Sequence, residues 1–245
     1  MSELVKTEAL VLRKMDFGDS SKIATLLSPD QGKISVIIKG GRSGKSKIGG
    51  VVDTLNHVEL VYYSKKSRDI QLVSQADLIN NFTGIKENLD SLKYSSAVLE
   101  LLYILTVSHQ EYDRLFRGAI KILKYMNGEQ NMSNYYFLKF FIFLLQELGY
   151  EFQFDNCTFC GTELIRTRGA KFNFELGMMC DNCSKERIYS YEFSQELFEA
   201  LICLSRKETE TLIKNSFVDN LIYFLERYLM FHIDEFKGLK SLQLI

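Results

Sequence analysis

Proline and histidine are scarce in this chain of 245 residues, which contains one proline and three histidines. The only proline, Pro29, lies far from every cysteine, and His57, His109 and His232 show no spacing typical of metal ligands. A zinc-dependent nucleoside deaminase would need a His-x-Glu motif and a Pro-Cys-x-x-Cys motif. These two scarcities therefore exclude that class of enzyme.

A surplus of charge of either sign is also missing. The chain has 30 Lys and Arg residues against 31 Asp and Glu residues, so its formal net charge is -1. Because no overall basic field attracts nucleic acid, any such site must be a local patch. The apolar fraction of 46% and the charged fraction of 25% are typical of a globular protein with one to three compact units.

Long hydrophobic runs are missing as well. The first six residues lack the apolar core of a signal peptide, and Lys139 interrupts the most apolar stretch, residues 135–145, which is too short to span a membrane. We therefore expect a cytoplasmic protein, associated with the nucleoid if it binds DNA. Disulfide bonds are rare in that compartment, so the five cysteines require another explanation.

Residues 1–81 carry five short segments rich in Val, Ile, Thr and Tyr, several of which alternate apolar with polar residues. The turn at residues 28–32 joins the second and third segments as a hairpin, because Pro29 fixes φ and Gly32 tolerates a positive φ. Five short strands of this kind predict a small closed barrel, for which the OB-fold is the commonest choice. The predicted strands are residues 4–14, 22–27, 33–39, 57–63 and 70–79.

After Phe82 the apolar period becomes that of helices, which predicts an α+β protein with an all-α domain at residues 82–245. Asn127-Gly128 ends the second helix, Gly149 ends the third, and Ser194 is a suitable N-cap of the fourth. A cysteine-bearing insert, residues 152–189, interrupts this domain. The predicted helices are residues 89–103, 111–126, 133–148, 194–204 and 217–236.

Two Cys-x-x-Cys pairs in the insert give the most specific signal in the chain. Cys157-Thr-Phe-Cys160 and Cys180-Asp-Asn-Cys183 are separated by 19 residues, a spacing typical of a tetrahedral zinc site. Each pair aims two sulfurs at one point, and Gly161 relieves the tight turn after the first pair. The alternative is a set of four unrelated buried cysteines.

The predicted zinc ion is structural rather than catalytic. Catalytic zinc usually keeps three protein ligands and an open position, whereas four thiolates close the coordination shell. Such an ion orders a loop that lacks its own core, and its binding energy enters as folding energy. The fifth cysteine, Cys203, lies alone on an apolar helix face and is predicted to be a core residue.

The glycine-rich segment at residues 39–47, KGGRSGKSK, looks at first sight like a nucleotide-binding P-loop. That motif requires a glycine five residues before Gly44, where this chain has Lys39, and a helix after Ser46. The residues that follow, from Lys47 to Val51, are a poor helix start, because glycine and β-branched residues disfavour helices. The nucleotide interpretation therefore fails on spacing and on context.

The same segment concentrates positive charge. Residues 33–47 contain five basic residues and no acidic one, and the glycines let a polyphosphate backbone approach closely. OB-folds bind nucleic acid with their loops and one face, where Phe17, Tyr62 and Tyr63 would stack on bases unless they pack in the barrel. The alternative is a solvated loop without a ligand. The predicted DNA-binding residues are Lys33, Lys39, Arg42, Lys45 and Lys47.

A second basic candidate lies on the predicted helix 111–126, where four basic residues are spaced by 3, 4 and 3 positions. At about 100° per residue they share one stripe, with an apolar set on the opposite side. The stripe either grips DNA phosphates or an acidic peptide, or it is a solvated outer face. The basic residues are Arg114, Arg117, Lys121 and Lys124, and the apolar ones are Leu115, Ala119, Ile122 and Met126.

Several short motifs follow one another in a fixed order along the chain. They are Thr7-Glu-Ala-Leu-Val-Leu12, Asp19-Ser20 through Leu26-Leu27, Gly32, and Lys39-Gly-Gly-Arg42 with Lys45-Ser46. In this order, and together with the four cysteines, they resemble the RecO family of bacterial recombination mediators along essentially the whole chain. Two features depart from the family: Glu is common there near Phe17-Gly18-Asp19, and stronger DNA binders are more basic.

The resemblance implies an N-terminal OB-fold, a helical domain and a zinc-bearing element, with the four cysteines as ligands and Lys39, Arg42 and Lys45 as barrel cations. It also implies binding of single- and double-stranded DNA, annealing of complementary strands, and help in loading recombinase onto DNA coated by single-stranded DNA-binding protein. The implied partners are RecR, the acidic C-terminal tail of single-stranded DNA-binding protein and, indirectly, RecA.

No pair of nucleophile and base is evident in the sequence, so no enzymatic activity is predicted. Two rival interpretations make different predictions. A zinc-stabilised scaffold that binds only proteins would ignore oligonucleotides, and a hydrolase that uses the glycine loop would turn over ATP.

Overall fold

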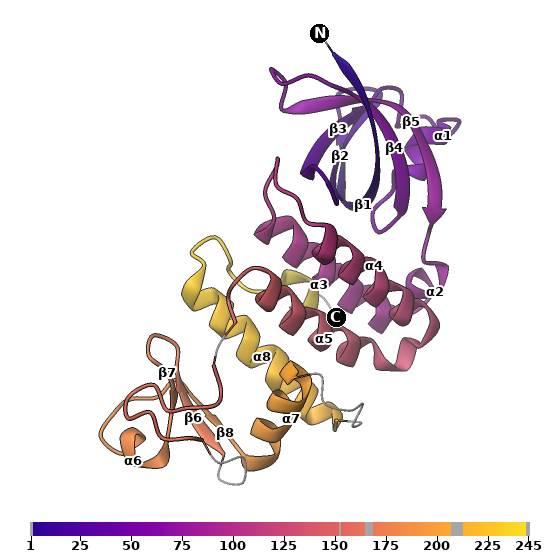
Figure 1. The fold of residues 1–245 in the computed structure, drawn as a ribbon. Coiled ribbons are helices and arrows are strands. Elements are labelled where there is room, and N and C mark those ends of the chain that lie inside the picture. The colour runs from indigo at the N-terminus through magenta and orange to yellow at the C-terminus, as the bar shows by residue number, and fades with distance from the viewer. Residues whose placement is uncertain (1, 152, 165–168, 207–212, 244–245) are drawn as a thin grey trace. The chain divides into compact units, whose positions relative to one another are not determined.

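The computed structural model describes residues 2–243 except 152, 165–168 and 207–212, so parts of the predicted insert 152–189 lie outside the described residues. The chain forms two compact units, residues 1–137 with 239–245 and residues 138–238 (Figure 1). Within the described ranges, no helix combines the length and hydropathy that a membrane crossing requires.

The first unit begins with a closed five-stranded barrel in the order β1-β2-β3-β5-β4. All its pairings are antiparallel except the one between β3 and β5, as the alternation of Val, Ile and Thr with polar residues favours. The predicted OB-fold barrel is therefore confirmed. The strands are β1 (Glu3–Phe17), β2 (Ser21–Ser28), β3 (Gly32–Ile38), β4 (His57–Ser64) and β5 (Ile70–Asn80).

The barrel interior is filled by alternate side chains of all five strands. β1 pairs with β4 through its first half and with β2 through its second half, and its register shifts between Val11 and Arg13. This irregularity bends the strand so that it closes the barrel. The buried core consists of Ala9, Val11, Ala24, Leu26, Ile34, Val36, Ile38, Val52, Val58, Leu60, Tyr62 and Val73.

A short helix, α1 (Lys47–Val51), follows the glycine-rich segment. The expectation that no helix starts at Lys47 was wrong. The Ser46 hydroxyl accepts a hydrogen bond from the Gly49 backbone N–H at 3.1 Å and caps the helix. A Cβ at Gly49 would lie 2.3 Å from the Gly41 carbonyl oxygen, so glycine permits close packing here. Capping and packing thus outweigh poor helix propensity.

Helices make up the rest of the first unit. Asn88 caps the first long helix by accepting from the Ser91 N–H at 2.9 Å, and the Ser91 and Ser133 hydroxyls are hydrogen-bonded at 2.9 Å. The helices are α2 (Thr83–Lys86), α3 (Leu89–Leu105), α4 (Asp113–Gly128), the 3-10 turn η1 (Gln130–Met132), α5 (Ser133–Glu147), which continues into the second unit, and α9 (Lys240–Gln243).

The β2–β3 hairpin is bonded to the segment between α3 and α4. The Lys33 N–H donates to the Val107 carbonyl at 3.0 Å, and the Tyr112 N–H donates to the Pro29 carbonyl at 2.8 Å. Gly32 has a φ of +65° and would clash with this segment if it carried a Cβ. The barrel and its helices are thus held together through the predicted hairpin turn.

The second unit packs a small sheet against two helices. Its strands, in the order β7-β6-β8, are β6 (Ala170–Asn173), β7 (Gly177–Met179) and β8 (Tyr191–Phe193). Phe172 of β6 and Phe193 of β8 contact Phe224, with ring centroids 5.2 and 4.8 Å apart. The insert therefore shares the core of the helix that carries Phe224. The helices are α6 (Asp181–Ser184), α7 (Gln195–Arg206) and α8 (Asn215–His232).

The boundaries of α7 and α8 test the helix predictions. Ser194 precedes α7, and its hydroxyl accepts from the Leu197 N–H at 3.3 Å, as an N-cap does. The last long helix ends at His232 rather than at residue 236, so that prediction was wrong. Ile233 is extended, and the turn that follows buries Phe236 completely.

Candidate metal centre and nucleic-acid interface

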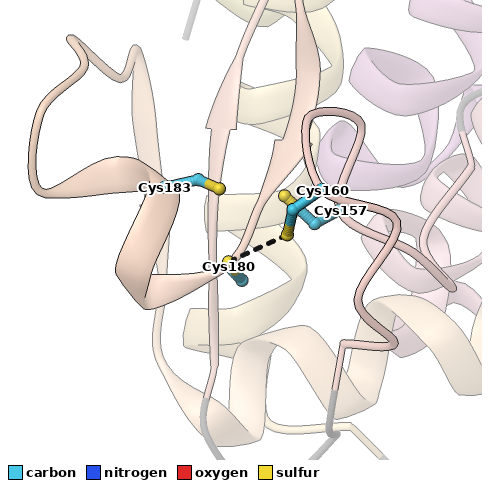
Figure 2. A group of neighbouring side chains, drawn as sticks. All are labelled: Cys157, Cys160, Cys180 and Cys183. Atoms are coloured by element: carbon cyan, nitrogen blue, oxygen red, sulfur yellow. Dashed lines mark hydrogen bonds between the residues drawn. The ribbon is translucent and has the colours of Figure 1, made fainter.

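The four paired cysteines come together from two separate loops of the second unit. Figure 2 shows the side chains of Cys157, Cys160, Cys180 and Cys183 facing one another, the first two from a loop before β6 and the last two from the start of α6. Gly161, with a φ of +70°, donates its N–H to the Cys157 carbonyl at 2.9 Å. This is the tight turn that the sequence predicted.

The spacing of the sulfurs fits a tetrahedral metal ion. The four Sγ atoms lie within 4.8 Å of one another, and those of Cys160 and Cys180 are 3.7 Å apart. Metal–sulfur bonds of about 2.3 Å give a tetrahedron with edges of about 3.8 Å. Within the described residues, this is the single cluster of three or more His, Cys, Asp or Glu side chains that can hold a metal ion.

Hydrogen bonds prepare part of the cluster to bind a cation. A hydrogen bond with the Thr162 hydroxyl, at 3.2 Å from Sγ, lowers the pKa of Cys160 to about 6. Burial alone would raise the pKa of Cys157, but three backbone N–H groups, of Cys180, Cys160 and Phe159, lower it. The hydrogen bond with Cys160 raises the pKa of Cys183 to about 12, because the thiols share protons. A metal ion would replace those protons.

The backbone holds the first cysteine pair against the small sheet. Both the backbone N–H and the hydroxyl of Thr158 donate to the Met178 carbonyl of β7, each at 2.9 Å. Met178 is fully buried. The loop that carries Cys157 and Cys160 is therefore fixed on a packed base. Cys203 lies elsewhere, on α7, and is partly buried.

The basic segment after β3 is exposed at one end of the barrel. Lys39, Arg42, Lys45 and Lys47 are all exposed. The Arg42 guanidinium donates to the Gly18 carbonyl at 2.8 Å, and its Nε lies 3.5 Å from Asp16. The β1–β2 turn thereby braces the loop between β3 and β4, so four of the predicted DNA-binding residues gather at one rim.

Lys33 does not join this group. It lies at the start of β3, and six residues of extended chain, about 20 Å, separate it from Lys39. Its ammonium donates to the Tyr103 carbonyl at 2.8 Å and lies 5.1 Å from the Tyr103 ring centroid. Burial lowers the pKa of Lys33. Its contacts are with α3, which is a structural role.

The three aromatic stacking candidates have different environments. Tyr62 is 3% exposed and belongs to the barrel core, so it is not available for stacking. Phe17 and Tyr63 are 51% and 37% exposed. Phe17 adjoins the β1–β2 turn beside the basic rim, and Tyr63 lies near the end of β4.

The basic stripe of α4 is exposed, as its spacing predicted. Arg117 pairs with Asp113 at 2.9 Å, and the Lys121 ammonium lies 5.9 Å from the Tyr125 ring centroid. The opposite face is buried through Leu115, Phe116, Ala119, Ile120, Leu123 and Met126. Ile122, expected in that set, is only half-buried.

The β4–β5 loop carries a third basic group, which was not predicted from the sequence. Lys65, Lys66 and Arg68 are exposed, and Lys65 and Arg68 line an open hollow with Tyr63. The signal was present, because Lys65-Lys66-Ser67-Arg68 lies one residue after the predicted strand 57–63. The charge signal is weaker than that of residues 33–47, because the β4–β5 loop also contains Asp69.

Comparisons with known proteins assign both parts of the chain to one family. The family model "Recombination protein O N terminal" matches residues 1–82, and "Recombination protein O C terminal" matches residues 86–243. The chain is 28% identical over 248 residues to the DNA repair protein RecO of Chloroherpeton thalassium, covering 96% of this chain and 95% of that protein.

Two further relatives carry the same name. The protein of Clostridium novyi is 29% identical over 182 residues, 74% of this chain and 70% of its own length. The protein of Prosthecochloris aestuarii is 34% identical over 162 residues, 66% of this chain and 61% of its own length.

Proposed function

Because the chain belongs to the RecO family, we propose that this DNA repair protein holds DNA by its phosphates on the rim of the OB-fold barrel. The observation that supports the proposal is the exposed group Lys39, Arg42, Lys45 and Lys47, which the β1–β2 turn braces through Arg42. Cations that bind a polyanion release its counterions. Because the loop is already braced, little conformational entropy of the loop is lost on binding.

The proposed activity is the annealing of complementary strands. Two strands bound to one cationic surface repel each other less and meet more often. Contacts with phosphates carry no sequence information, so the protein would act on any sequence. No covalent bond changes in this process, and the protein would help to load recombinase onto DNA coated by single-stranded DNA-binding protein.

The proposed cofactor is a structural zinc ion held by Cys157, Cys160, Cys180 and Cys183. Four thiolates in two Cys-x-x-Cys turns are the donor set that zinc prefers, and they leave no open position for catalysis. The ion would supply folding energy to the loops around β6 and β7.

The proposed partners are single- and double-stranded DNA, RecR, the acidic C-terminal tail of single-stranded DNA-binding protein and, indirectly, RecA. The exposed α4 stripe is a second basic surface for DNA or for such a tail. We place the protein in the cytoplasm at the nucleoid, where these partners would be found.

The proposal is tested with labelled oligonucleotides in a salt titration. Arg42→Ala/Lys45→Ala should weaken binding to all sequences and reduce the slope of log K against log salt by about 1.4 for single strands, about 0.7 per lost contact. Lys6→Ala/Lys237→Ala removes the same charge from exposed positions elsewhere and should leave the slope unchanged. An equal slope in all three proteins would refute the assignment of the rim.

Annealing separates the proposal from the protein-only scaffold. The wild type should speed the annealing of complementary oligonucleotides at low salt and lose this effect as salt rises. A folded, metal-loaded protein that neither binds nor anneals oligonucleotides in dilute buffer, even with RecR supplied, would favour the scaffold.

A further inference from the structure

We propose that the four-cysteine cluster is a thiol switch, in which a peroxide oxidises Cys160 and Cys180 to a disulfide and the bound metal ion is released. This inference rests on the proposed structural zinc ion and adds to it a reaction of the ligands themselves. It commits to one disulfide, which joins the two loops of the cluster rather than the two cysteines of one Cys-x-x-Cys pair.

The four sulfurs differ in their access to solvent. Cys160 is exposed, Cys180 and Cys183 are partly buried, and Cys157 is only 2% exposed. Oxidation of a cysteine depends on its thiolate character and on its exposure. A bound metal ion keeps all its thiol ligands deprotonated, so exposure is what distinguishes them. Cys160 is therefore the first site of attack by an oxidant.

Cys180 is the thiol that can complete the disulfide. Its Sγ lies 3.7 Å from the Sγ of Cys160, and Figure 2 marks this contact between the two loops. A small side-chain rotation brings sulfurs at this separation to bonding distance. The other cysteine of the first pair, Cys157, is held in its turn, because its N–H donates to the Thr162 carbonyl at 2.8 Å and its carbonyl accepts from the Gly161 N–H at 2.9 Å.

Backbone contacts align the two segments independently of the sulfurs. The N–H and the hydroxyl of Thr158 both donate to the Met178 carbonyl at 2.9 Å, and Cys160 and Cys180 each follow two positions later. Gly177 allows this approach, because a Cβ there would lie 2.8 Å from the Thr158 methyl group. These contacts keep Cys160 beside Cys180 when the metal ion leaves.

Arg187 forms a further link between the loops. Its guanidinium carbon lies 4.3 Å from the ring centroid of Phe159, and its Nη1 donates to the Cys183 carbonyl at 3.1 Å. Phe159 lies inside the first cysteine pair, and Cys183 belongs to the second. A cation over an aromatic face is attracted to it with or without a metal ion. The two loops are thus attached to each other in both forms of the switch.

The reaction balances with one peroxide molecule per disulfide. The Cys160 thiolate attacks a peroxide oxygen, the O–O bond breaks, and a sulfenic acid and a hydroxide ion form. The Cys180 thiolate then attacks the Cys160 sulfur, the S–O bond breaks, the S–S bond forms, and a second hydroxide ion leaves. The two thiolates together lose two electrons, which the peroxide gains, and both hydroxide ions take up protons from water.

The disulfide changes what holds the loops together. It removes two of the four ligands, and structural zinc sites need all four, so the ion is released. The new covalent bond joins the same loops and restricts the segment between them, which contains β6 and β7. The oxidised second unit should therefore stay ordered without metal. In the proposed cytoplasmic location a disulfide is usually transient and redox-sensing, as a switch requires.

The test treats the metal-loaded full-length chain with hydrogen peroxide, blocks the remaining thiols with N-ethylmaleimide and maps the tryptic peptides by mass spectrometry. Trypsin leaves the first cysteine pair in residues 140–166 and the second in residues 172–185. A disulfide between the loops therefore joins two peptides, whereas a disulfide within a pair joins none. The joined peptides should carry the maleimide on Cys157 and Cys183, and a zinc-binding dye should record one released ion per disulfide.

Two matched double variants test which sulfurs react. Cys157→Ser/Cys183→Ser keeps the exposed Cys160 with Cys180, whereas Cys160→Ser/Cys180→Ser keeps the buried Cys157 with Cys183. Each variant retains one cysteine per loop, and both are compared without metal. The first should form its disulfide roughly tenfold faster than the second, because its reactive thiol is exposed. Equal rates would contradict the role of Cys160.

Hydrogen exchange distinguishes the oxidised form from a form that has merely lost its metal. Amides of β6 and β7 should exchange more slowly in the peroxide-treated protein than in the reduced protein after chelation. Dithiothreitol with added zinc should restore the metal-loaded form. Exchange that is as fast after oxidation as after chelation would show that the disulfide does not replace the ion.

The outcomes separate this inference from the proposed zinc site. If the chain binds no zinc at its four cysteines, the proposed cofactor fails. If it binds zinc, but peroxide releases none or the mapped disulfide joins Cys180 to Cys183 within one pair, the switch alone is overturned. Oligonucleotide binding is measured separately, so neither result changes the test of the basic rim.

Discussion

At the scale of single residues, environment decides what a side chain does. Lys33 and Lys39 both belong to the basic segment of the sequence, yet one donates to the Tyr103 carbonyl and the other is exposed at the rim. Tyr62 and Tyr63 are neighbours, yet one is in the core and the other is on the surface, because strand residues alternate between faces. Two predictions belong to this scale.

Position 32 requires glycine for two reasons: its φ is positive, and the neighbouring backbone leaves no space for a Cβ. A Cβ at this position would lie 2.4 Å from the Val107 carbonyl oxygen and 2.6 Å from that of Gln110. Gly32→Ala should lower the free energy of unfolding of the first unit by about 2–3 kcal/mol, measured by urea titration. Gly40→Ala is the matched control, since Gly40 has a φ of +66° with open space around it, and should cost only about 1 kcal/mol. Equal losses would contradict the clash.

His57 makes stability depend on pH. Its buried ring packs edge-on against Phe116, and its Nε2 lies 3.3 Å from the Glu8 carboxylate. Burial, the largest influence, lowers the pKa of His57, Glu8 opposes this, and Lys124 lowers it further. The unfolded chain, with a pKa near 6.5, therefore binds a proton more readily than the folded chain.

The buried neutral His57 contributes fully to the free energy of unfolding above about pH 6.5. As the pH falls below that value, the free energy of unfolding decreases by at most about 1.4 kcal/mol per pH unit on account of this residue. Thermal unfolding at pH 7.5 and 5.5 measures it. Between these two pH values, the Tm of the wild type should fall more than the Tm of His57→Phe, which keeps the other acid-sensitive groups. The same loss in both proteins would show that His57 is not the cause.

At the scale of elements, periodicity predicted most helices and strands, and packing set their ends. The five barrel strands and the main helices follow from patterns that extend over a few residues. The existence of α1 does not follow from a period, because it depends on the Ser46 cap and on the close contact between Gly41 and Gly49. The end of α8 does not either, because the turn after it buries Phe236. The short strand β8 and the helices α2, α6 and α9 carry too few residues for a period to show.

If the four cysteines hold the proposed zinc ion, the loops that carry them are the element whose stability depends most on a ligand. Cys180→Ser should lose the bound metal, and hydrogen exchange should rise in β6 and β7, while the barrel amides keep their protection. Chelation of the wild type should give the same pattern. Cys203→Ser is the matched control, because Cys203 lies outside the cluster, and it should keep one metal ion per chain. Retention of metal by Cys180→Ser would contradict the four-thiolate site.

At the scale of the whole molecule, the end of the chain returns to the first unit. After Gly238 the chain leaves the second unit, and α9 packs on α3. The Glu100 carboxylate accepts from the Lys240 N–H at 3.0 Å, the Ser241 N–H at 2.9 Å and the Ser241 hydroxyl at 2.6 Å. One acidic side chain thus caps the last helix from 140 residues away.

Removal of this cap should free the end of the chain. Glu100→Ala eliminates three hydrogen bonds to a charged group, each worth about 1.5–3 kcal/mol. Limited trypsin digestion should then cut after Lys240 much faster than in the wild type, as mass spectrometry of the products would show. Ser241→Ala keeps the two backbone bonds and should be cut at an intermediate rate. Equal rates for all three proteins would mean that Glu100 does not hold α9.

The sequence by itself determined the class of the fold and the four cysteines of the candidate metal site. Alternation, helical spacing and two Cys-x-x-Cys pairs are local signals, since each is complete within a few residues or one turn. The tertiary structure alone decided which cations share a surface. Lys33 lies away from the rim, although the sequence groups it with Lys39. Tyr63 lies opposite Leu4 and Leu72 and lines a hollow with Lys65 and Arg68. Strand register and barrel closure bring these residues together, and no local pattern relates them.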